Sequence, residues 1–375
     1  MGDSGDTADG DTADGDTADG ATADGATVRR PTMMDVARAA GVSQSSVSLV
    51  LNDMTGARIS DQTRQRVTAA AQDLGYVVPA ARRGGGLGAS TQTIAYMADE
   101  ISTTVFPVQS IDGARDAAWE QGLLLSTYVA RSNMALEAAT IDSIRRTPGL
   151  VGVIYATVFT REIKLPAALD GLNVVLLNCY TADRDRLSVV PGEFVGGFNA
   201  TNHMIRQGHR RIGLINGEPW MDASADRLAG YRQALASADI PFDADLVLDG
   251  DWLPDSGRAH FATLMTLPAP PTGVFCGNDM MAVGAIQMAD TLGLRVPEDV
   301  SIIGYDDQVI AAYTQPPLTT VLLPNYEMGR IAASLLMDGA FNRKEPYTKL
   351  IKVDCPVVVR ESVGPRASPG DTMAS

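Results

Sequence analysis

The sequence predicts a small all-α domain near the N-terminus and a large α/β core of two doubly wound parallel-sheet subdomains. Between residues 32 and 76, apolar residues recur at helical spacing. From residue 93 onward, strand-like and helix-like stretches alternate over about 270 residues, which exceeds what one sheet needs. A stretch rich in glycine and alanine, residues 79–92, separates the two regions and reads as a linker.

Val42–Asn52 predicts a short helix with one polar face. Ser43 is placed to act as the N-cap, and Val47, Val50 and Leu51 follow at i, i+3 and i+4. The other face is uncharged and carries Gln44, Ser45, Ser48 and Asn52. Short hydrogen-bonding side chains of this kind suit contacts to phosphates and base edges.

A partner helix is predicted directly before it. Thr32–Asp35 resembles a capping box with Asp in place of Glu, and Val36, Ala37 and Ala40 share one face. Gly41 permits a tight turn. Two short helices joined at a glycine, the second polar outward, form a helix-turn-helix arrangement, although the pattern alone also fits an αα-hairpin.

A third helix is predicted from Asp61 to about Leu74, with Ser60 as its cap and Gly75 at its end. The side chains expected to face inward are Val67, Ala70, Ala71 and Leu74. A three-helix domain of this size is marginal by itself, so DNA or a dimer partner would stabilise it.

The net charge of −15 is unevenly distributed. Residues 1–28 carry −8, residues 29–83 carry +4 and the remainder carries −11. The only basic segment therefore contains the two-helix motif, and DNA affinity requires local positive charge. The acidic tail, residues 1–29, consists largely of five-residue repeats and is expected to be disordered. It is either a neutral tail or a competitor of DNA for the basic domain.

Three widely spaced cysteines, Cys179, Cys276 and Cys355, form no disulfide framework or metal-binding spacing. No apolar run is long enough to cross a membrane, and no signal peptide begins the chain. We therefore expect a soluble, cytoplasmic protein without a cofactor, a metal or a membrane partner. Gly84–Ala89 superficially matches a dinucleotide fingerprint, but no predicted strand precedes it.

The core shows the alternation typical of parallel sheets covered on both faces. Strands are expected at 93–97, 123–129, 150–155, 173–177, 211–216, 246–249, 273–276 and 300–304, and helices at 108–122 and 135–146, among others. Ligands of such folds bind beyond the carboxyl ends of the strands.

Polar side chains stand at several of these strand ends. Asn178, Asn278 and Asp306 each follow an apolar strand. Arg227 lies at a loop-to-helix junction, and Trp252 follows another strand. Taken singly, each could be a helix cap or a turn residue. Together they suit a polyol, whose hydroxyls take bidentate hydrogen bonds and whose apolar face stacks on a ring.

With these residues in place, the chain resembles a transcription regulator of the lac repressor (LacI/GalR) family from Thr32 to about Val363. The matching motifs are Met34–Ser43 (MDVARAAGVS), Val47–Asn52 (VSLVLN), Thr63–Val67 (TRQRV), Leu74–Tyr76 (LGY), Gly208–Ile212 (GHRRI), Arg227–Arg232 (RLAGYR), Gly277–Ala282 (GNDMMA), Val296–Asp307 (VPEDVSIIGYDD) and Pro316–Thr320 (PPLTT).

The resemblance implies a helix-turn-helix headpiece, a hinge and a core similar to type I periplasmic binding proteins. It also implies a homodimer that reads a pseudo-palindromic double-stranded operator and binds a small, sugar-like effector. The expected ranges are 30–78 for the headpiece, 79–92 for the hinge, 93–363 for the core and 364–375 for a disordered tail. Within the core they are 93–190 plus 321–345 for the N-subdomain and 191–320 plus 346–363 for the C-subdomain.

The resemblance also implies roles for single residues. Gln44 and Ser45 would read bases. The other expected DNA-contacting residues, several of them on phosphates, are Thr32, Ser43, Ser46, Ser48, Leu49, Asn52, Arg58, Ser60 and Leu87. The expected effector-binding residues are Arg227, Asn278 and Asp306, with Trp252 packing on the ligand and Asn178, Asp99 and Phe106 at cleft positions.

Three departures from the family pattern have consequences. Leu49 stands where the family often has Arg, which removes a guanine contact and predicts a different operator preference. The loop 53–59 is about two residues longer than usual. The glycines at 84–86 occupy the expected hinge helix and disfavour it by roughly 1 kcal/mol each, leaving Leu87 as a displaced candidate for the minor-groove wedge.

The main hypothesis is a repressor in which an effector changes the angle between the subdomains and hence the spacing of two headpieces, with a coupling energy of ~1–3 kcal/mol. A solute-binding protein is the first alternative, and the missing signal peptide and the basic headpiece argue against it. A sugar-modifying enzyme is the second. The chain lacks a phosphate-binding loop, a nucleophile elbow and paired metal histidines. His209 is expected to cap a turn, and adjacent Asp306 and Asp307 should diverge, so we expect no catalysis.

Overall fold

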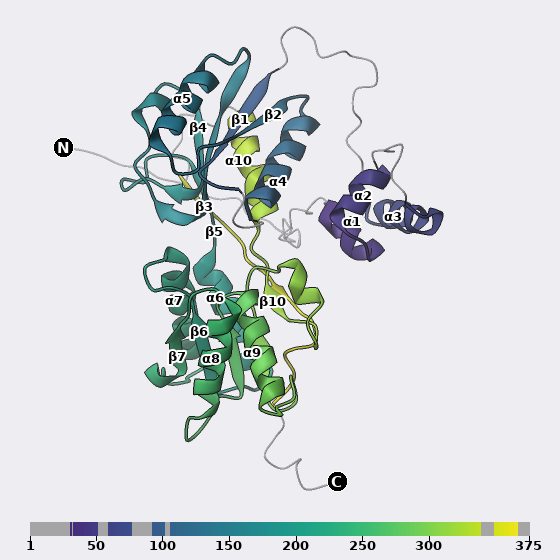
Figure 1. Cartoon of the computed structure of the whole chain (residues 1–375), viewed down its shortest axis with the longest axis vertical. Helices are drawn as coiled ribbons and strands as arrows, with labels where there is room; N and C mark the ends of the chain where they lie inside the picture. The colour runs from purple at the N-terminus through teal and green to yellow at the C-terminus, as the bar shows by residue number, and fades with distance from the viewer. Residues whose placement is uncertain are drawn as a thin grey trace, which may run out of the picture. The chain divides into compact units, whose positions relative to one another are not determined.

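The computed structural model describes residues 31, 33–51, 59–76, 92–101, 106–338 and 349–366. The chain divides into two compact units, residues 1–83 and 84–375. Each unit is described by itself, and Figure 1 labels the helices and strands of both.

The first unit contains three helices, α1 (Met33–Ala40), α2 (Gln44–Leu51) and α3 (Asp61–Asp73). Val36, Val47 and Val67, one from each helix, are fully buried in its small core. Gly41, with φ +62°, makes the turn between α1 and α2. The prediction that Leu74 faces inward is wrong. Leu74 is the C-cap residue of α3, past its last turn, and its exposure is 38%.

The N-subdomain of the second unit is built on a six-stranded parallel sheet in the order β11-β5-β4-β3-β1-β2. Its strands are β1 (Thr93–Ala98), β2 (Leu124–Val129), β3 (Leu150–Glu162), β4 (Val174–Tyr180), β5 (Ser188–Pro191) and β11 (Leu350–Val353). Its helices are α4 (Phe106–Glu120), α5 (Met134–Arg145) and α10 (Asn325–Met337).

The two faces of this sheet are covered by different helices (Figure 1). Ile94 and Tyr96 of β1 pack in one cluster with residues of α4 and α10. Ala95 and Met97, which alternate with them, pack in a second cluster with residues of α5. All six residues of β1 are consequently buried, as in a strand covered on both faces.

The C-subdomain has a four-stranded parallel sheet in the order β7-β6-β8-β9. Its strands are β6 (Ile212–Asn216), β7 (Val247–Asp249), β8 (Gly273–Cys276) and β9 (Ser301–Ile303). Residues of α6 (Glu193–Arg206) and α7 (Asp222–Ser237) pack on one face, and those of α8 (Pro254–Met265) and α9 (Asp279–Thr291) on the other. Three short 3-10 helices complete the core, η1 (Ala167–Leu169), η2 (Ala244–Leu246) and η3 (Val309–Ala312).

The chain passes between the subdomains three times. The passages lie at Gly192 after β5, between β10 (Thr320–Val321) and α10, and between β11 and β12 (Val357–Val358). They are joined by hydrogen bonds, since Gly192 N donates to Val353 O (2.7 Å) and Leu322 N donates to Pro356 O (2.9 Å). β10 and β12 form a small antiparallel sheet.

The assignment of residues 346–363 to the C-subdomain is wrong for β11. This strand pairs in parallel with β5 and extends the N-subdomain sheet at its edge. The sequence analysis did not find β5, β10, β11 or β12, each only two to four residues long. Strands this short show no periodic pattern of their own, although β7, β8 and β9, which are equally short, were found from their apolar stretches.

Helices of the core pack in pairs that cross at glycines. A Cβ on Gly230 of α7 would overlap the carbonyl oxygen of Phe194 of α6, and a Cβ on Gly197 of α6 would lie 2.5 Å from that of Arg227. The other reciprocal pairs are Gly113 with Gly329 between α4 and α10, and Gly257 with Gly284 between α8 and α9. Backbone therefore meets backbone at each crossing, and α6 and α7 lie close enough to share an ion pair.

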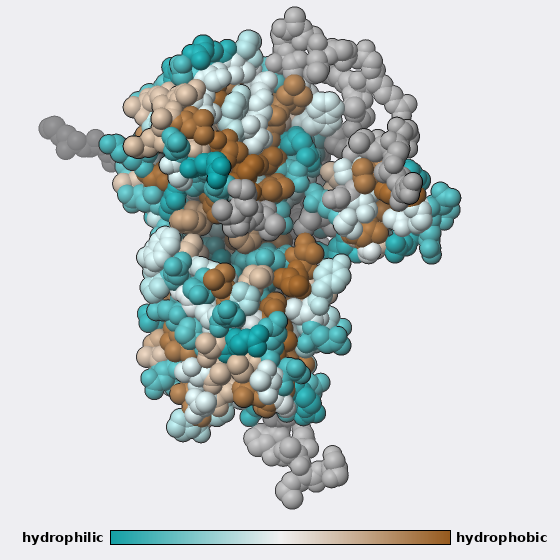
Figure 2. All heavy atoms as spheres, viewed as in Figure 1, coloured by the Kyte–Doolittle hydropathy of each residue, from teal (hydrophilic) through white to brown (hydrophobic). Residues whose placement is uncertain are grey.

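Among the residues that the structure describes, no helix combines the length and apolarity needed to cross a membrane. On the face shown in Figure 2, hydrophobic residues are interspersed with hydrophilic ones over both subdomains. Scattered exposed apolar side chains of this kind are usual for a folded protein in water.

Candidate functional site

The helix α2 presents a polar, uncharged surface. Ser43 caps it, because its Oγ accepts from the backbone N–H of Ser46 (3.2 Å). Val47 and Val50 point into the headpiece core. The predicted contact residues Gln44, Ser46, Ser48 and Leu49 are half-buried on the helix, and Ser45 belongs to the same helix. The capped helix and its inward face confirm the predicted secondary structure, while the DNA-contacting roles stay predictions.

The third helix begins at a second serine cap. Ser60 Oγ accepts from the backbone N–H of Thr63 (3.2 Å) and lies 2.9 Å from its hydroxyl oxygen. Ser60 itself is exposed, so a phosphate could still approach its hydroxyl. The remaining predicted DNA contacts, Thr32, Asn52, Arg58 and Leu87, lie outside the described residues.

Arg227, near the start of α7, is the centre of a buried polar cluster in the C-subdomain. Its Nε and Nη2 donate to the two carboxylate oxygens of Glu193 at 2.8 and 2.9 Å. Its Nη1 donates to the carbonyl oxygen of Gly277, and its guanidinium lies 3.6 Å from the ring centroid of Tyr305. Arg227 and Glu193 are both almost completely buried. Sequence reasoning found Arg227 but missed Glu193, which has no local pattern to mark it.

Asp306 and Trp252 border this cluster. Asp306 Oδ1 lies 3.7 Å from Arg227 Nη2, and Oδ2 accepts from Gln308 Nε2 (3.1 Å). The Trp252 ring centroid lies 5.5 Å from the Arg227 guanidinium carbon. Burial raises the pKa of the Asp306 carboxyl to about 7, against the opposing charge of Arg227. Asp307 instead bonds Arg360 (2.6 Å), so the two aspartates diverge as predicted.

Both hydrogen-bonding groups of the Asn278 side chain are used within the protein. Its Oδ1 accepts from the backbone N–H of Met281 (2.8 Å) and so caps α9, and its Nδ2 donates to Trp252 O (3.0 Å). The next residue, Asp279, was not predicted as a site residue. It is fully buried, accepts from Thr320 Oγ1 (2.6 Å), and burial followed by the charge of Asp306 raises its pKa well above the usual value. Asn278 therefore acts as a helix cap. Its side chain could contact a ligand only by giving up one of these two hydrogen bonds.

Three of the predicted effector residues have left-handed backbone conformations. The φ angles are +57° for Asn178, +68° for Trp252 and +104° for Asp306. Such conformations are uncommon for residues other than glycine and concentrate at ligand sites. Trp252 and Asp306 follow the carboxyl ends of β7 and β9, and Asn178 lies near the carboxyl end of β4, so all three conformations occur at the carboxyl ends of strands in the two sheets.

On the N-subdomain side, Asp99 follows β1. Its Oδ1 accepts from the backbone N–H of Val158 (3.0 Å) and its Oδ2 from Arg161 Nη2 (2.9 Å). Burial raises the pKa of Asp99, and Arg161 opposes that shift. Phe106 is the half-buried first residue of α4, and within the part of the chain that the structure describes it makes no hydrogen bond, ion pair or ring contact with the Arg227 cluster.

Two contacts that sequence reasoning missed join the subdomains beside this cluster. The rings of Phe159 and Trp220 meet edge to face, with centroids 5.6 Å apart. Tyr180 Oη donates to Asp222 Oδ2 (2.5 Å). Phe159 was overlooked because β3 runs to Glu162, past the strand end predicted at residue 155. Met221, between Trp220 and Asp222, accepts from Trp252 Nε1 (3.0 Å) at its sulfur, which connects these contacts to the Arg227 cluster.

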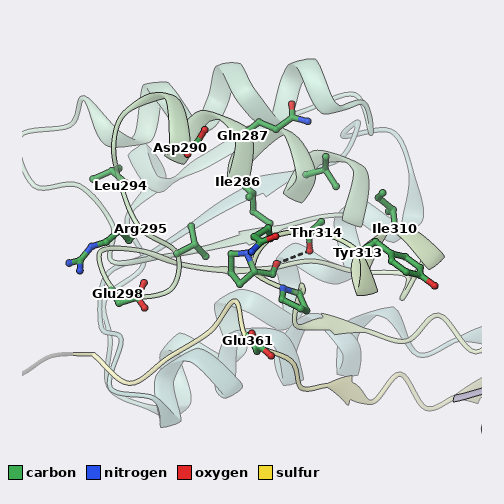
Figure 3. Close-up of a pocket in the computed structure, with 15 residues that line it drawn as sticks. Ile286, Gln287, Asp290, Leu294, Arg295, Glu298, Ile310, Tyr313, Thr314 and Glu361 are labelled. Carbon is green, nitrogen blue, oxygen red and sulfur yellow. Dashed lines mark hydrogen bonds between the residues drawn. The ribbon is translucent and has the colours of Figure 1, made fainter. Parts of the chain in front are cut away.

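A separate pocket of about 820 Å³ lies on the C-subdomain, between α9, η3 and the following loop (Figure 3). Figure 3 shows Ile286 and Gln287 from α9 on one side and Tyr313 and Thr314 on another. None of the predicted effector residues lines it. His209, expected to cap a turn, instead joins Thr272 Oγ1 (2.9 Å) to Gly364 O (3.1 Å) and anchors the C-terminal segment.

Comparison with known proteins agrees with this geometry. Residues 32–78 match the family described as bacterial regulatory proteins, lacI family, and residues 201–363 match a periplasmic binding protein-like domain. The HTH-type transcriptional repressor PurR of Proteus mirabilis is 32% identical over 335 residues, which cover 88% of this chain and 96% of that protein. The chain belongs to the lacI family. A PurR of Yersinia pestis (strain Pestoides F) matches with the same identity and coverage.

Solved structures of the lacI family share the fold. A complex of the transcriptional regulator CelR with cellobiose is 31% identical, with a TM-score of 0.59, covering 89% of this chain and 100% of that one. A putative LacI-family regulator from Rhizobium etli is 28% identical, with a TM-score of 0.66, over 72% of this chain and 99% of that one. The lac repressor dimer bound to operator and ONPF, at 24% identity and a TM-score of 0.61, shows the fold alone, over 90% of this chain and 100% of that one.

The family confirms the predicted combination of a helix-turn-helix headpiece and a periplasmic-binding-protein-like α/β core. As a lacI-family member, the protein is a DNA-binding transcriptional repressor controlled by a small-molecule effector. Its relatives are regulators and not enzymes, in line with the expected lack of catalysis.

Proposed function

We propose that this repressor acts as a homodimer on a pseudo-palindromic operator and that a sugar-like effector controls its affinity for DNA. The effector site comprises Asp99, Asn178, Arg227, Trp252, Asn278 and Asp306 together with Trp220 and Phe159, where the two subdomains meet. The proposed site also includes Phe106, the first residue of α4.

The single observation that carries the effector assignment is a set of polar side chains at the carboxyl ends of strands in both sheets. Asn178 and Asp306 stand in left-handed conformations beside the carboxyl ends of β4 and β9, and Trp252 supplies a ring next to Arg227. Carboxylate and amide groups around an aromatic face fit the hydroxyls and the apolar face of a sugar. The CelR relative, whose structure contains cellobiose, supports the same ligand class.

The DNA-reading assignment rests on α2. Its half-buried polar face offers amide and hydroxyl groups, and Ser43 and Ser60 stand at two helix N-termini, where phosphates bind favourably. We propose Gln44 and Ser45 for base contacts. The remaining proposed contacts are Thr32, Ser43, Ser46, Ser48, Leu49, Asn52, Arg58, Ser60 and Leu87. Reading two half-sites requires two headpieces, which supports the homodimer.

The test is a mobility-shift titration of operator fragments with the full chain, with and without cellobiose, glucose and galactose. Trp252→Ala should bind DNA normally but lose the response to the active sugar, because the stacking face is removed. Trp119→Ala is the matched control, since Trp119 is an exposed residue of α4 outside the cluster. A Trp252→Ala protein that responds as the wild type does would refute the site. A wild type whose operator affinity ignores every sugar that binds the core would refute the function.

A further inference from the structure

The ion pair of Arg227 with Glu193 decides which charge the site presents. Glu193 accepts hydrogen bonds from both Nε and Nη2, the two donors on one edge of the guanidinium. That edge is the one that otherwise suits a phosphate or a carboxylate. Glu193 begins α6 and Arg227 lies on α7, and the close crossing of these helices at Gly197 and Gly230 holds the pair together.

The groups next to this pair are mostly acceptors. Asp306 lies 3.7 Å from Arg227 and is in turn close enough to Asp279 to raise its pKa. Asn216, at the carboxyl end of β6, gives its Nδ2 to Ser224 O (3.1 Å) and keeps a buried Oδ1 without a hydrogen-bond partner. The neighbouring Ser224 Oγ is likewise buried without a partner. Because Glu193 neutralises Arg227, no unpaired cationic group remains among the residues of this cluster to balance an added anion.

We propose that Glu193 sets the charge selectivity of the effector site, so that it accepts a neutral polyol or an amino sugar and rejects sugar phosphates and sugar acids. The proposal rests on the proposed function and refines its ligand class. An anion would meet Asp306 without a free cationic fork to hold it. A hydroxyl or an ammonium group can donate to Asp306 and, after a small opening, to Asn216 Oδ1. Glu193 acts here as a positioning residue, through Arg227.

The experiment removes the negative charge of Glu193 and measures anion binding. Isothermal titration of the full chain with inorganic phosphate, at constant ionic strength, compares the wild type with Glu193→Gln. We expect Glu193→Gln to bind phosphate at least about tenfold more tightly than the wild type does, the effect of one charge-assisted hydrogen bond. Glu193→Asp keeps the charge and should stay insensitive to phosphate.

The matched control is Glu120→Gln. Glu120 makes a bidentate pair with Arg330 at 3.0 and 2.9 Å between α4 and α10, away from the proposed site. This variant should not gain phosphate affinity. An equal gain in Glu120→Gln, or no gain in a folded Glu193→Gln, would overturn the proposal.

A second measurement uses the wild type alone, in case Glu193→Gln does not fold. The change in operator affinity, whether release or tighter binding, is titrated with glucose, glucosamine, glucuronate and glucose 6-phosphate. Glucuronate or glucose 6-phosphate acting at lower concentration than the neutral and cationic sugars would overturn the charge assignment. Action by glucose or glucosamine without action by the anions supports it. If no sugar of any charge binds the core, the proposed function fails, while a phosphate gain specific to Glu193→Gln would still support the role of Glu193.

Discussion

At the scale of single residues, the Arg227 cluster shows how a buried charge is held. Taking an arginine and a carboxylate out of water is costly, and the two groups offset that cost only with good geometry. Here two parallel hydrogen bonds join them, and the carbonyl of Gly277 and the ring of Tyr305 fill further sides of the guanidinium. Losing one partner should therefore cost far more than losing both.

Arg227→Ala should lower the free energy of unfolding of the core by ~3–5 kcal/mol, because Glu193 is left buried without a partner. The double variant Glu193→Leu/Arg227→Leu should recover most of this loss. Urea unfolding followed by circular dichroism measures both. Arg330→Ala is the control, because its partner Glu120 is partly exposed and can be solvated. A loss in Arg330→Ala as large as that in Arg227→Ala would contradict this account of burial.

The stability contribution of Asp306 should depend on pH. Its carboxyl has a pKa of about 7 in the folded chain, so it retains a proton that the unfolded chain has already released above about pH 4. The stabilisation is complete below that value and is lost as the pH rises through about 7. Asp306→Asn cannot lose a proton there, so its unfolding free energy relative to the wild type should rise between about pH 5 and pH 8. A difference that stays constant or falls over this range would disprove the shift.

At the scale of helices and strands, local signals were enough for some elements and not for others. Ser43 and Ser60 were identified as caps because the bond that they make lies within three residues of sequence. The strand β11 was placed in the wrong subdomain because its partner β5 is about 160 residues away in the chain. The four residues of β11 contain no local signal that indicates this pairing. The long-range pair Glu193–Arg227 escaped for the same reason, whereas Arg227 and Trp252 were found by their motif and their strand end.

Ser60 should have separable structural and DNA-binding roles. Ser60→Ala removes the N-cap of α3 and should destabilise the headpiece by ~1 kcal/mol. Ser60→Asp keeps a capping oxygen and suits the helix N-terminus, so stability should be retained, but its charge should repel a phosphate and weaken operator binding. Thermal unfolding and mobility-shift titration distinguish the two. Normal DNA affinity in Ser60→Asp would remove Ser60 from the proposed phosphate contacts.

At the scale of the whole effector-binding unit, two side-chain contacts hold the subdomains together away from the chain passages. These are the edge-to-face pair Phe159–Trp220 and the hydrogen bond from Tyr180 to Asp222. The first pair belongs to the proposed effector site, and the second joins the last residue of β4 to the first residue of α7. Their free energy favours the arrangement seen here, and a ligand that prefers another angle must first break them.

Tyr180→Phe combined with Trp220→Ala should weaken this arrangement and increase the radius of gyration of the ligand-free protein in X-ray scattering. The effector concentration that half-saturates the change in DNA binding should shift in the same variant. Tyr155→Phe is the control, because the hydroxyl of Tyr155 bonds Glu137 (2.6 Å) within the N-subdomain. An unchanged radius and an unchanged effector response would show that these contacts do not govern the angle.

The threefold passage of the chain between the lobes limits how they can swing. Peptide groups on neighbouring passages share hydrogen bonds. We therefore expect the three backbone segments to act as one hinge and not as three independent linkers. Twisting the lobes about any other axis would tear those bonds. We therefore expect a bound ligand to change the angle of the lobes mainly by rotation about the axis on which these three passages lie.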